Sequence, residues 1–343
     1  MERREFLITL AGLAGAGALS RLAAAETAAE KSTDASGAIL PKRALGRTGE
    51  AVTMLGLGGY HIGWTTEARA QATIEAALME GIRFFDTAES YAAGVSEQRY
   101  GTYLVPKFRN NVFLMTKTTA KDAATARAHL DGSRRRLKTD VIDLWQLHAL
   151  ESPEDVDTRI ANGVVEVLLE AKRSGVVRHL GFTGHASPYA LAKIMERYGK
   201  DMPFAACQMP VNPVDTAAAH SFAKSALPKA VQHGLGVLAM KTLADGRFFA
   251  EKTVNGQITW QTGNPIVPAR LSLEECLLFV WSLPTAVLIT GAEKPEYVRD
   301  KAAICRKFHT LNDADRLALV RRVATFAEAG QVEYYKEAVL ATS

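Results

Sequence analysis

The chain has 343 residues, of which 48% are hydrophobic and 23% charged, and its formal net charge at pH 7 is +4. This charge is small for the length, and no block of Lys and Arg alternates with aromatic residues, so we do not expect a nucleic-acid partner. The cysteines Cys207, Cys276 and Cys305 lack a Cys-x-x-Cys pairing, which argues against a disulfide framework and against an iron–sulfur or zinc site.

The amino-terminal residues have the three-part layout of an export signal. Arg3 and Arg4 precede an apolar, Gly- and Ala-rich run from Phe6 to Leu19, and an Ala-x-Ala cleavage site follows at 23–25. The paired arginines resemble a twin-arginine signal. We therefore expect residues 1–25 to direct the protein through the twin-arginine export machinery to the periplasm, with no stable membrane insertion. The alternative is an uncleaved apolar tail that holds the protein at the membrane.

The rest of the chain is expected to form a short tether and one domain. Residues 26–40 are rich in Ala, Ser and Thr without periodicity, which indicates a mobile tether. Residues 41–343 suffice for a single barrel of typically ~250 residues plus a C-terminal helical extension.

Apolar runs with strand character alternate with amphipathic segments along this domain. We expect strands at 52–57, 83–86, 111–117, 141–148, 177–185, 204–208, 236–239 and 286–289. We expect helices at 67–80, 96–103 (with Ser96 as N-cap), 122–137, 160–173, 271–283, 295–307 and 313–329, the last outside the barrel. This alternation predicts an α/β fold, a (β/α)8 TIM barrel. The segment 244–270 lacks a clear period and is expected to be a functional loop at the barrel rim.

Three of the predicted strands end in residues that can take part in chemistry. Asp86, Lys117 and His148 each close an apolar run, and successive members are 31 residues apart, about one strand plus one helix. Tyr91 follows Asp86 in the next loop. Because the C-terminal ends of the strands meet at one rim of a parallel barrel, we expect all four side chains to converge.

The segments around these residues resemble the aldo-keto reductases, from about Arg43 to about Lys307. The matching motifs are Phe84-Phe85-Asp86-Thr87-Ala88-Glu89-x-Tyr91 followed by Ser96-Glu97, then Met115-Thr116-Lys117, then Ile142-Asp143-Leu144-x-Gln146-Leu147-His148. In that family an Asp, a Tyr, a Lys and a His form the active site in this order. The resemblance therefore implies that Asp86, Tyr91, Lys117 and His148 are catalytic. It also implies NADPH-dependent reduction of an aldehyde or ketone to an alcohol, with NADH as the other cofactor to consider.

These residue types suit carbonyl reduction, in which the nicotinamide supplies a hydride and a protein group supplies a proton. Tyr91 is the candidate acid, and a free phenol has a pKa of about 10. We expect the Lys117 ammonium to lower that pKa and Asp86 to hold Lys117 charged. His148 would orient the carbonyl and donate to its oxygen. Taken singly, each residue also has a structural interpretation, as part of a rim ion pair or of the packed core.

The resemblance also implies contacts to the nicotinamide end of the cofactor. Gly59 and Tyr60 would lie near the ring, although Gly59 suits a tight turn equally well. Gln208 matches the family's glutamine beside the carboxamide. Thr183 and His185 stand where the family commonly has Ser-Asn, and His185 as a cap of the following helix is an equal alternative.

Other positions depart from the family's pattern. Val211 and Met240 each stand where relatives often carry a tyrosine, and the Met240 thioether can still pack against an aromatic ring. Lys241 and Leu243 follow Met240 and are further candidate cofactor contacts.

The phosphate-binding end is expected after the last two strands, at Gly291. NADPH-preferring relatives often have a Lys-Ser pair and an Arg there, for which Lys294 and Arg299 are the substitutes in this chain. Lys294 is equally well explained as a solvated surface charge. The preference between NADPH and NADH therefore stays open.

Two other classes of function remain to be weighed. The altered residues at the cofactor end leave open a nucleotide-binding barrel that acts as a regulatory or partner subunit. The complete set of Asp86, Tyr91, Lys117 and His148 argues for turnover instead. A metal-dependent hydrolase or lyase would need several His and carboxylate ligands at the strand ends, which the sequence does not show, so we expect no metal. The natural substrate, a small carbonyl compound, and the oligomeric state are not determined by the sequence.

Overall fold

The computed structural model describes residues 33–34, 37–254 and 257–336. Residues 1–25, which we expect to form an export signal, and residues 26–32 of the expected tether lie outside the described residues. Within the described ranges, no helix is long and apolar enough to cross a membrane.

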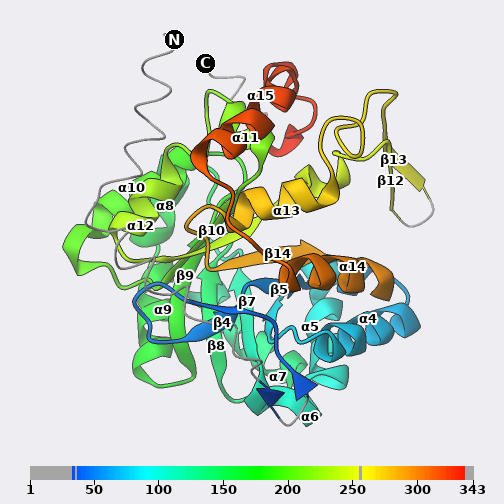
Figure 1. The fold of residues 1–343 in the computed structure, drawn as a ribbon. Helices are drawn as coiled ribbons and strands as arrows, with labels where there is room; N and C mark the ends of the chain where they lie inside the picture. Colours follow the sequence, from blue (N-terminus) through cyan, green and yellow to red (C-terminus); the bar gives the residue numbers. More distant parts are fainter. Residues whose placement is uncertain (1–32, 35–36, 255–256, 337–343) are drawn as a thin grey trace.

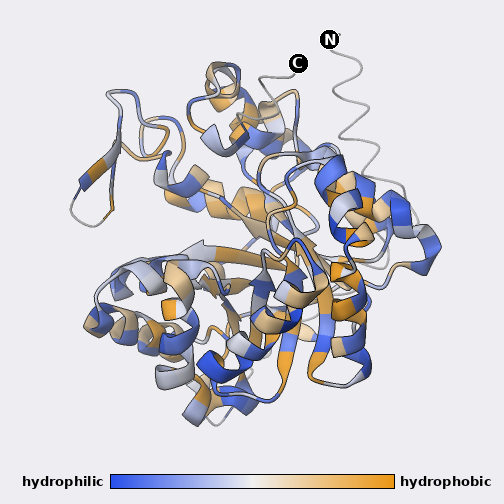
Figure 2. Ribbon diagram, turned by 180° about the vertical axis from the view of Figure 1, so that it is seen from behind, coloured by the Kyte–Doolittle hydropathy of each residue, from blue (hydrophilic) through white to orange (hydrophobic). Residues whose placement is uncertain are grey.

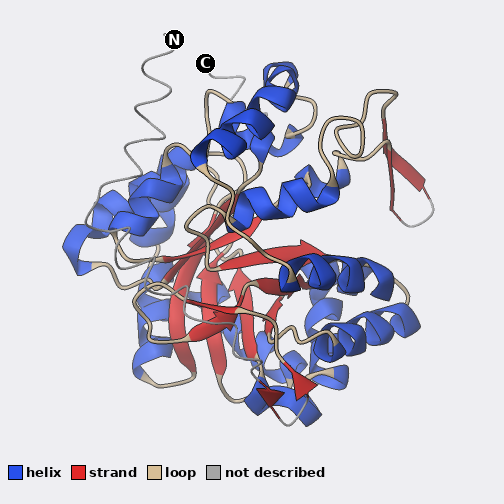
Figure 3. Cartoon of the chain, viewed as in Figure 1, coloured by secondary structure: helices blue, strands red, loops and turns tan. Residues whose placement is uncertain are grey.

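Eight parallel strands close into a barrel in the order β10-β11-β14-β5-β6-β7-β8-β9 (Figures 1 and 3). The strands are β5 (Leu55–Gly58), β6 (Phe84–Asp86), β7 (Phe113–Thr118), β8 (Ile142–Leu147), β9 (Val177–Thr183), β10 (Ala206–Pro210), β11 (Gly236–Met240) and β14 (Val287–Gly291). The predicted TIM barrel is thus confirmed. Apolar residues dominate these strands, as a sheet covered on its outer face by helices requires (Figure 2).

Helices surround the barrel and carry both apolar and polar residues (Figures 2 and 3). They are α3 (Gly59–Trp64), α4 (Glu67–Met79), α5 (Val95–Tyr103), α6 (Val105–Phe108), α7 (Ala123–Leu137), α8 (Pro153–Ala161), α9 (Val164–Arg173), α10 (Pro188–Tyr198), α11 (Pro213–Ala217), α12 (Ala226–Gln232), α13 (Leu273–Trp281), α14 (Pro295–Arg306) and α15 (Asp313–Ala329). The terminal helix α15 lies against α11 and α13, outside the barrel as expected.

The first predicted strand, 52–57, is two strands in the structure. Its first half, β4 (Ala51–Thr53), pairs antiparallel with β3 (Lys42–Ala44), and only the second half, β5, enters the barrel. The break falls at Met54, whose N–H donates to the carbonyl of Pro41 at 2.8 Å. Val52 belongs to the same buried apolar cluster as the barrel residues Phe84 and Phe113, so the β3–β4 hairpin contributes to the core inside the barrel.

Part of the expected tether is held against the barrel. β1 (Thr33–Asp34) and β2 (Gly37–Ala38) pair with each other, and Asp34 accepts two hydrogen bonds from the Arg83 guanidinium at 2.7 and 2.9 Å. Leu40 is fully buried and donates its N–H to the carbonyl of Gly81. The composition of this segment does not reveal these contacts, because each depends on one partner far along the chain.

Two predicted helix starts are wrong. Ser96 is not the N-cap of α5, because the helix begins at Val95 after Gly94 in the left-handed region, with a φ of 90°. The predicted helix 160–173 is the end of α8 followed by α9, with Gly163 at a φ of 75° between them. Glycine tolerates such angles without steric cost, so both boundaries follow from backbone conformation and not from side-chain caps.

The segment 244–270 contains regular structure that its lack of period concealed. β12 (Glu251–Val254) and β13 (Gln257–Gln261) form an antiparallel hairpin, which projects away from the barrel in Figure 1. Most of the hairpin is exposed or half-exposed, so no buried face imposes an alternating pattern on its sequence.

Candidate active site

Asp86, Tyr91 and Lys117 meet at the end of β6 and β7. The Lys117 ammonium donates to Asp86 Oδ1 at 2.5 Å, to the Thr87 carbonyl at 2.8 Å and to the Tyr91 hydroxyl at 3.1 Å. All three ammonium hydrogens are therefore engaged. Asp86 supplies the negative charge that a buried ammonium requires, and Tyr91 is the only one of the three acceptors that can release a proton.

His148 completes the group from the end of β8. Its ring lies edge-on to the Tyr91 ring, with centroids 5.6 Å apart and an interplanar angle of 76°. Its Nδ1 lies 3.4 Å from the Ser90 hydroxyl, the residue before Tyr91. The four side chains therefore converge in the structure as expected, although Asp86, Lys117 and His148 are spaced 31 residues apart at the ends of three successive strands.

Burial and charge set the protonation of these groups. Burial lowers the pKa of Lys117, but Asp86 and Tyr91 outweigh it and raise that pKa, so Lys117 stays charged. Burial raises the pKa of Tyr91 and outweighs the opposite effect of Lys117. Our expectation of a net lowered Tyr91 pKa is therefore wrong for the free protein. Burial, and then the Lys117 charge, hold the pKa of His148 well below its ordinary value, so its imidazole is neutral.

The turn that follows Tyr91 has an unusual backbone. Ala92 and Ala93 have φ values of 50° and 53°, in the left-handed region that non-glycine residues rarely adopt, and Gly94 follows at 90°. Three consecutive residues of this kind redirect the chain from Tyr91 into α5. Such strain concentrates at functional sites, where the surrounding structure holds it in place.

The expected nicotinamide contacts lie around this group. Tyr60 is 43% exposed, and its ring stands edge-on to Tyr91 at 5.5 Å. Gln208 is buried, with its amide oxygen accepting from Gln146 at 2.8 Å and its side chain also bonded to Asp86. The amide of Gln208 thus has partners within the protein before any ligand binds.

Thr183 and His185 lie on the same side of the barrel as His148. The Thr183 hydroxyl accepts from the Ala149 N–H at 3.3 Å, and the His185 ring centroid is 6.0 Å from that of His148. Burial, and then Lys241, lower the pKa of His185 to about 3. Ser187, not His185, is the N-cap residue of α10, so the capping alternative is wrong.

Two of the predicted glycine contacts, Gly59 and Gly291, also have a structural explanation. A Cβ on Gly59 would lie 2.5 Å from Ser96 Oγ and 2.6 Å from the Asp86 carbonyl oxygen. A Cβ on Gly291 would lie 2.3 Å from His61 Nδ1. The space beside both glycines is filled by the protein itself, so close packing requires them whether or not a ligand approaches.

The predicted contacts Met240, Lys241 and Leu243 lie at the end of β11 and in the turn that follows it. Met240 is buried at the strand end, and Lys241 has a φ of 56° and pairs with Asp245 at 3.2 Å. Leu243 packs against the hydrophobic core.

Lys294 and Arg299 make their contacts on α14, away from Asp86, Tyr91, Lys117 and His148. Lys294 lies over the ring of Tyr297, and the exposed Arg299 pairs with Glu296 on α14 at 3.8 Å. Both are exposed cations, and their part in binding the 2′-phosphate stays a prediction.

Two buried polar atoms near the ends of β11 and β14 were missed by the sequence. Thr242 Oγ1 and His61 Nδ1 are buried without a hydrogen-bond partner in the described part of the chain. Buried polar groups are normally hydrogen-bonded, so a polar ligand at this rim suits both atoms, and a nicotinamide cofactor fits the site on this ground. The sequence does not reveal that these two atoms are buried without a hydrogen-bond partner. The part of the chain that the structure describes holds no group of three or more His, Cys, Asp or Glu side chains suited to a metal ion.

A parallel eight-stranded barrel with a Tyr, a Lys, an Asp and a His gathered at one rim defines the class of protein. The profile of the aldo/keto reductase family matches residues 54–315, and the chain belongs to that family of oxidoreductases, whose cofactor is NADPH or NADH.

Individual relatives agree with this assignment. The chain is 31% identical over 283 residues to a 6-dehydroglucose reductase from Novosphingobium aromaticivorans, covering 76% of this chain and 88% of the relative. The fold is similar to that of the aldo-keto reductase AKR11C1 from Bacillus halodurans, with a TM-score of 0.68, 23% identity and coverage of 82% and 96% of the two chains. An aldo-keto reductase from Klebsiella pneumoniae in complex with NADPH gives a TM-score of 0.63, 23% identity and coverage of 82% and 95%.

Proposed function

We propose that the protein reduces an aldehyde or ketone to an alcohol with NADPH, or with NADH, and that Tyr91 is the general acid. The observation that carries this proposal is the contact of Lys117 Nζ with both Asp86 and the Tyr91 hydroxyl, beside the neutral imidazole of His148. This arrangement offers a proton donor, a cation that stabilises its conjugate base, and a neutral hydrogen-bond donor within one site.

The chemistry requires one hydride and one proton. The cofactor, when bound, supplies the hydride to the carbonyl carbon. Tyr91 gives its phenolic proton to the carbonyl oxygen, and the resulting tyrosinate is stabilised by the Lys117 ammonium. Because its pKa is raised, Tyr91 holds its proton at neutral pH until charge develops on the substrate. His148 donates a hydrogen bond to the same oxygen, and solvent returns a proton to Tyr91 after release of the alcohol.

The test is the oxidation of NADPH and of NADH by the purified protein with a panel of aldehydes and ketones. Sugar aldehydes belong in that panel, because one relative is named as a 6-dehydroglucose reductase. We expect turnover with at least one carbonyl compound and measurable affinity for one cofactor. Cofactor binding without any turnover would instead favour a regulatory or partner subunit.

We also propose that residues 1–25 export the protein to the periplasm, on the basis of Arg3, Arg4 and the apolar run behind them. Cell fractionation of the full chain and of an Arg3→Lys/Arg4→Lys variant tests this. The unaltered chain should be periplasmic and the variant cytoplasmic. Equal cytoplasmic retention of both would contradict export by this route.

A further inference from the structure

The turn directly after His148 is strained. Ala149 has a φ of 53°, in the left-handed region where an alanine Cβ crowds the backbone. The turn departs from β8 and determines the direction in which the His148 side chain leaves the strand end. Glycine would relieve the strain, so the alanine must be held in this conformation by neighbouring groups.

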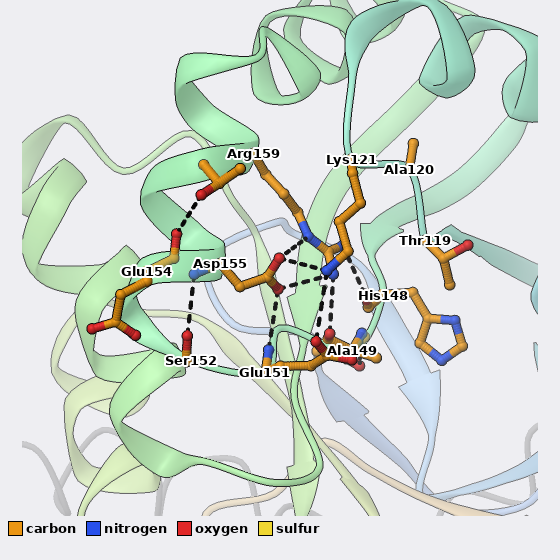
Figure 4. Close-up of polar contacts among 12 residues, drawn as sticks. Thr119, Ala120, Lys121, His148, Ala149, Glu151, Ser152, Glu154, Asp155 and Arg159 are labelled. Atoms are coloured by element: carbon orange, nitrogen blue, oxygen red, sulfur yellow. Dashed lines mark hydrogen bonds and ion pairs between the residues drawn. The ribbon is translucent and has the colours of Figure 1, made fainter. Parts of the chain in front are cut away.

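A buried guanidinium holds the turn. Arg159, on α8, donates from Nη1 to the His148 carbonyl at 2.8 Å and from Nη2 to the Ala149 carbonyl at 3.1 Å. Figure 4 shows Arg159 reaching from its helix to this turn while the His148 ring points to the other side. Only 1% of Arg159 is exposed, so its charge is withdrawn from water and requires compensation.

Asp155 supplies that compensation and joins two strand ends. It lies one helical turn before Arg159 and contacts it at 3.1 Å and 3.0 Å. The same carboxylate accepts from Lys121 at 2.5 Å and from the N–H of Glu151 at 3.2 Å (Figure 4). Lys121 follows β7, the strand that carries Lys117. The Asp155–Arg159 pair thereby connects the loops after the two strands that bear Lys117 and His148.

We propose that Arg159, supported by Asp155, is a positioning residue that fixes the strained His148–Ala149 turn and so aims the His148 imidazole toward Tyr91 and the substrate carbonyl. This inference rests on the proposed function. Among the described residues, the polar contacts of Arg159 are with the His148 and Ala149 carbonyls and with Asp155, so it acts through His148 and not on the reacting atoms. Lysine cannot replace it fully, because one ammonium lacks the planar fork that reaches two carbonyls at once.

The first experiment compares Arg159→Met and Arg159→Lys with Arg173→Met, a control in which an exposed arginine on α9 loses its surface partner Glu166. We expect Arg159→Met to lower kcat by about 10- to 100-fold, since small displacements of a catalytic group have effects of this size. Arg159→Lys should fall between this variant and the unaltered protein. KM and the Kd for the cofactor should stay unchanged in both, and circular dichroism should confirm that they fold. The control should keep full activity.

The second experiment repeats Arg159→Lys and Arg159→Met in a His148→Gln background. If Arg159 acts through His148, neither substitution should lower kcat further once the imidazole is absent. An equal loss in both backgrounds, or full activity of Arg159→Met with His148 present, would overturn the positioning role while leaving the proposed reduction intact. Absence of turnover in the unaltered protein would overturn both.

Discussion

The two halves of the barrel rim each hold a set of polar groups, and the two sets differ in whether the protein supplies their partners. At the ends of β6, β7 and β8, Lys117 uses all three of its hydrogens on Asp86, Thr87 and Tyr91. At the ends of β11 and β14, Thr242 Oγ1 and His61 Nδ1 are buried without partners within the described residues. The Lys117 network of the first half is organised before any ligand arrives, whereas these two atoms of the second half can gain hydrogen bonds only from a ligand.

This contrast separates the two tasks of the site. Proton transfer needs groups held at fixed distances, and the internal network around Lys117 provides them without a ligand. The oxidised cofactor must dissociate after each turnover. Contacts that form only when the cofactor binds therefore suit this half of the site. Substitutions in the first half should therefore affect turnover and stability together, and substitutions in the second half should affect cofactor affinity alone.

The largest effect is expected for Lys117→Met. Removing the ammonium leaves Asp86 buried without its counter-ion, which typically costs about 3–5 kcal/mol of the free energy of unfolding. Turnover should fall by about 10²- to 10⁴-fold, because the tyrosinate loses its stabilising charge. Denaturant unfolding and steady-state kinetics measure the two effects.

A double variant provides the control for this prediction. Lys117→Met combined with Asp86→Asn removes both charges and should recover much of the lost stability but none of the activity. Unchanged stability in Lys117→Met alone would show that the pair is not buried as the structure has it.

A smaller effect on the stability of the fold is expected at acidic pH. The folded-state pKa values of His148 and His185 lie below the ordinary value, that of His185 at about 3. As pH falls below about 6.5, the unfolded chain takes up protons that the folded chain does not, so stability should decrease. Thermal unfolding between neutral and acidic pH should show this decrease, and His185→Gln should make it shallower. The same slope in that variant would contradict the neutral state of His185 in the folded protein.

The smallest effect is expected for Thr242→Val. The free protein should be as stable as before or slightly more so, because the buried hydroxyl has no partner to lose. The cofactor Kd, measured by titration, should rise by about 5- to 10-fold, the value of one hydrogen bond. Thr73→Val is the matched control, since Thr73 on α4 also has a buried hydroxyl without a partner. Thr73→Val should leave the cofactor Kd unchanged. An equal rise of the Kd in both variants would show that Thr242 does not contact the cofactor.

The sequence revealed the organised half of the rim better than the other half. Asp86, Lys117 and His148 close apolar runs at a regular interval, and barrel topology alone brings such positions together. Arg159 and Thr242 were not identifiable, because what distinguishes them is burial and the presence or absence of a partner. Gly59 and Gly291 were interpreted as ligand contacts, although the structure shows that Ser96 and His61 occupy the space beside them. A glycine in sequence does not reveal which neighbour excludes a Cβ.

The net direction of the Tyr91 pKa also could not be predicted from sequence. The Lys117 charge acts in the expected direction, but the extent of burial decides the outcome. The residue types identify the participants, and only the packing around them determines which effect is larger.

The central claim is that Tyr91 transfers the proton, and Tyr91→Phe tests it most directly. The substitution keeps the aromatic ring and removes the hydroxyl that lies 3.1 Å from Lys117. We predict a loss of kcat of about 10²- to 10⁴-fold with an unchanged Kd for the cofactor. Near-normal turnover of this variant with a carbonyl substrate would contradict the account.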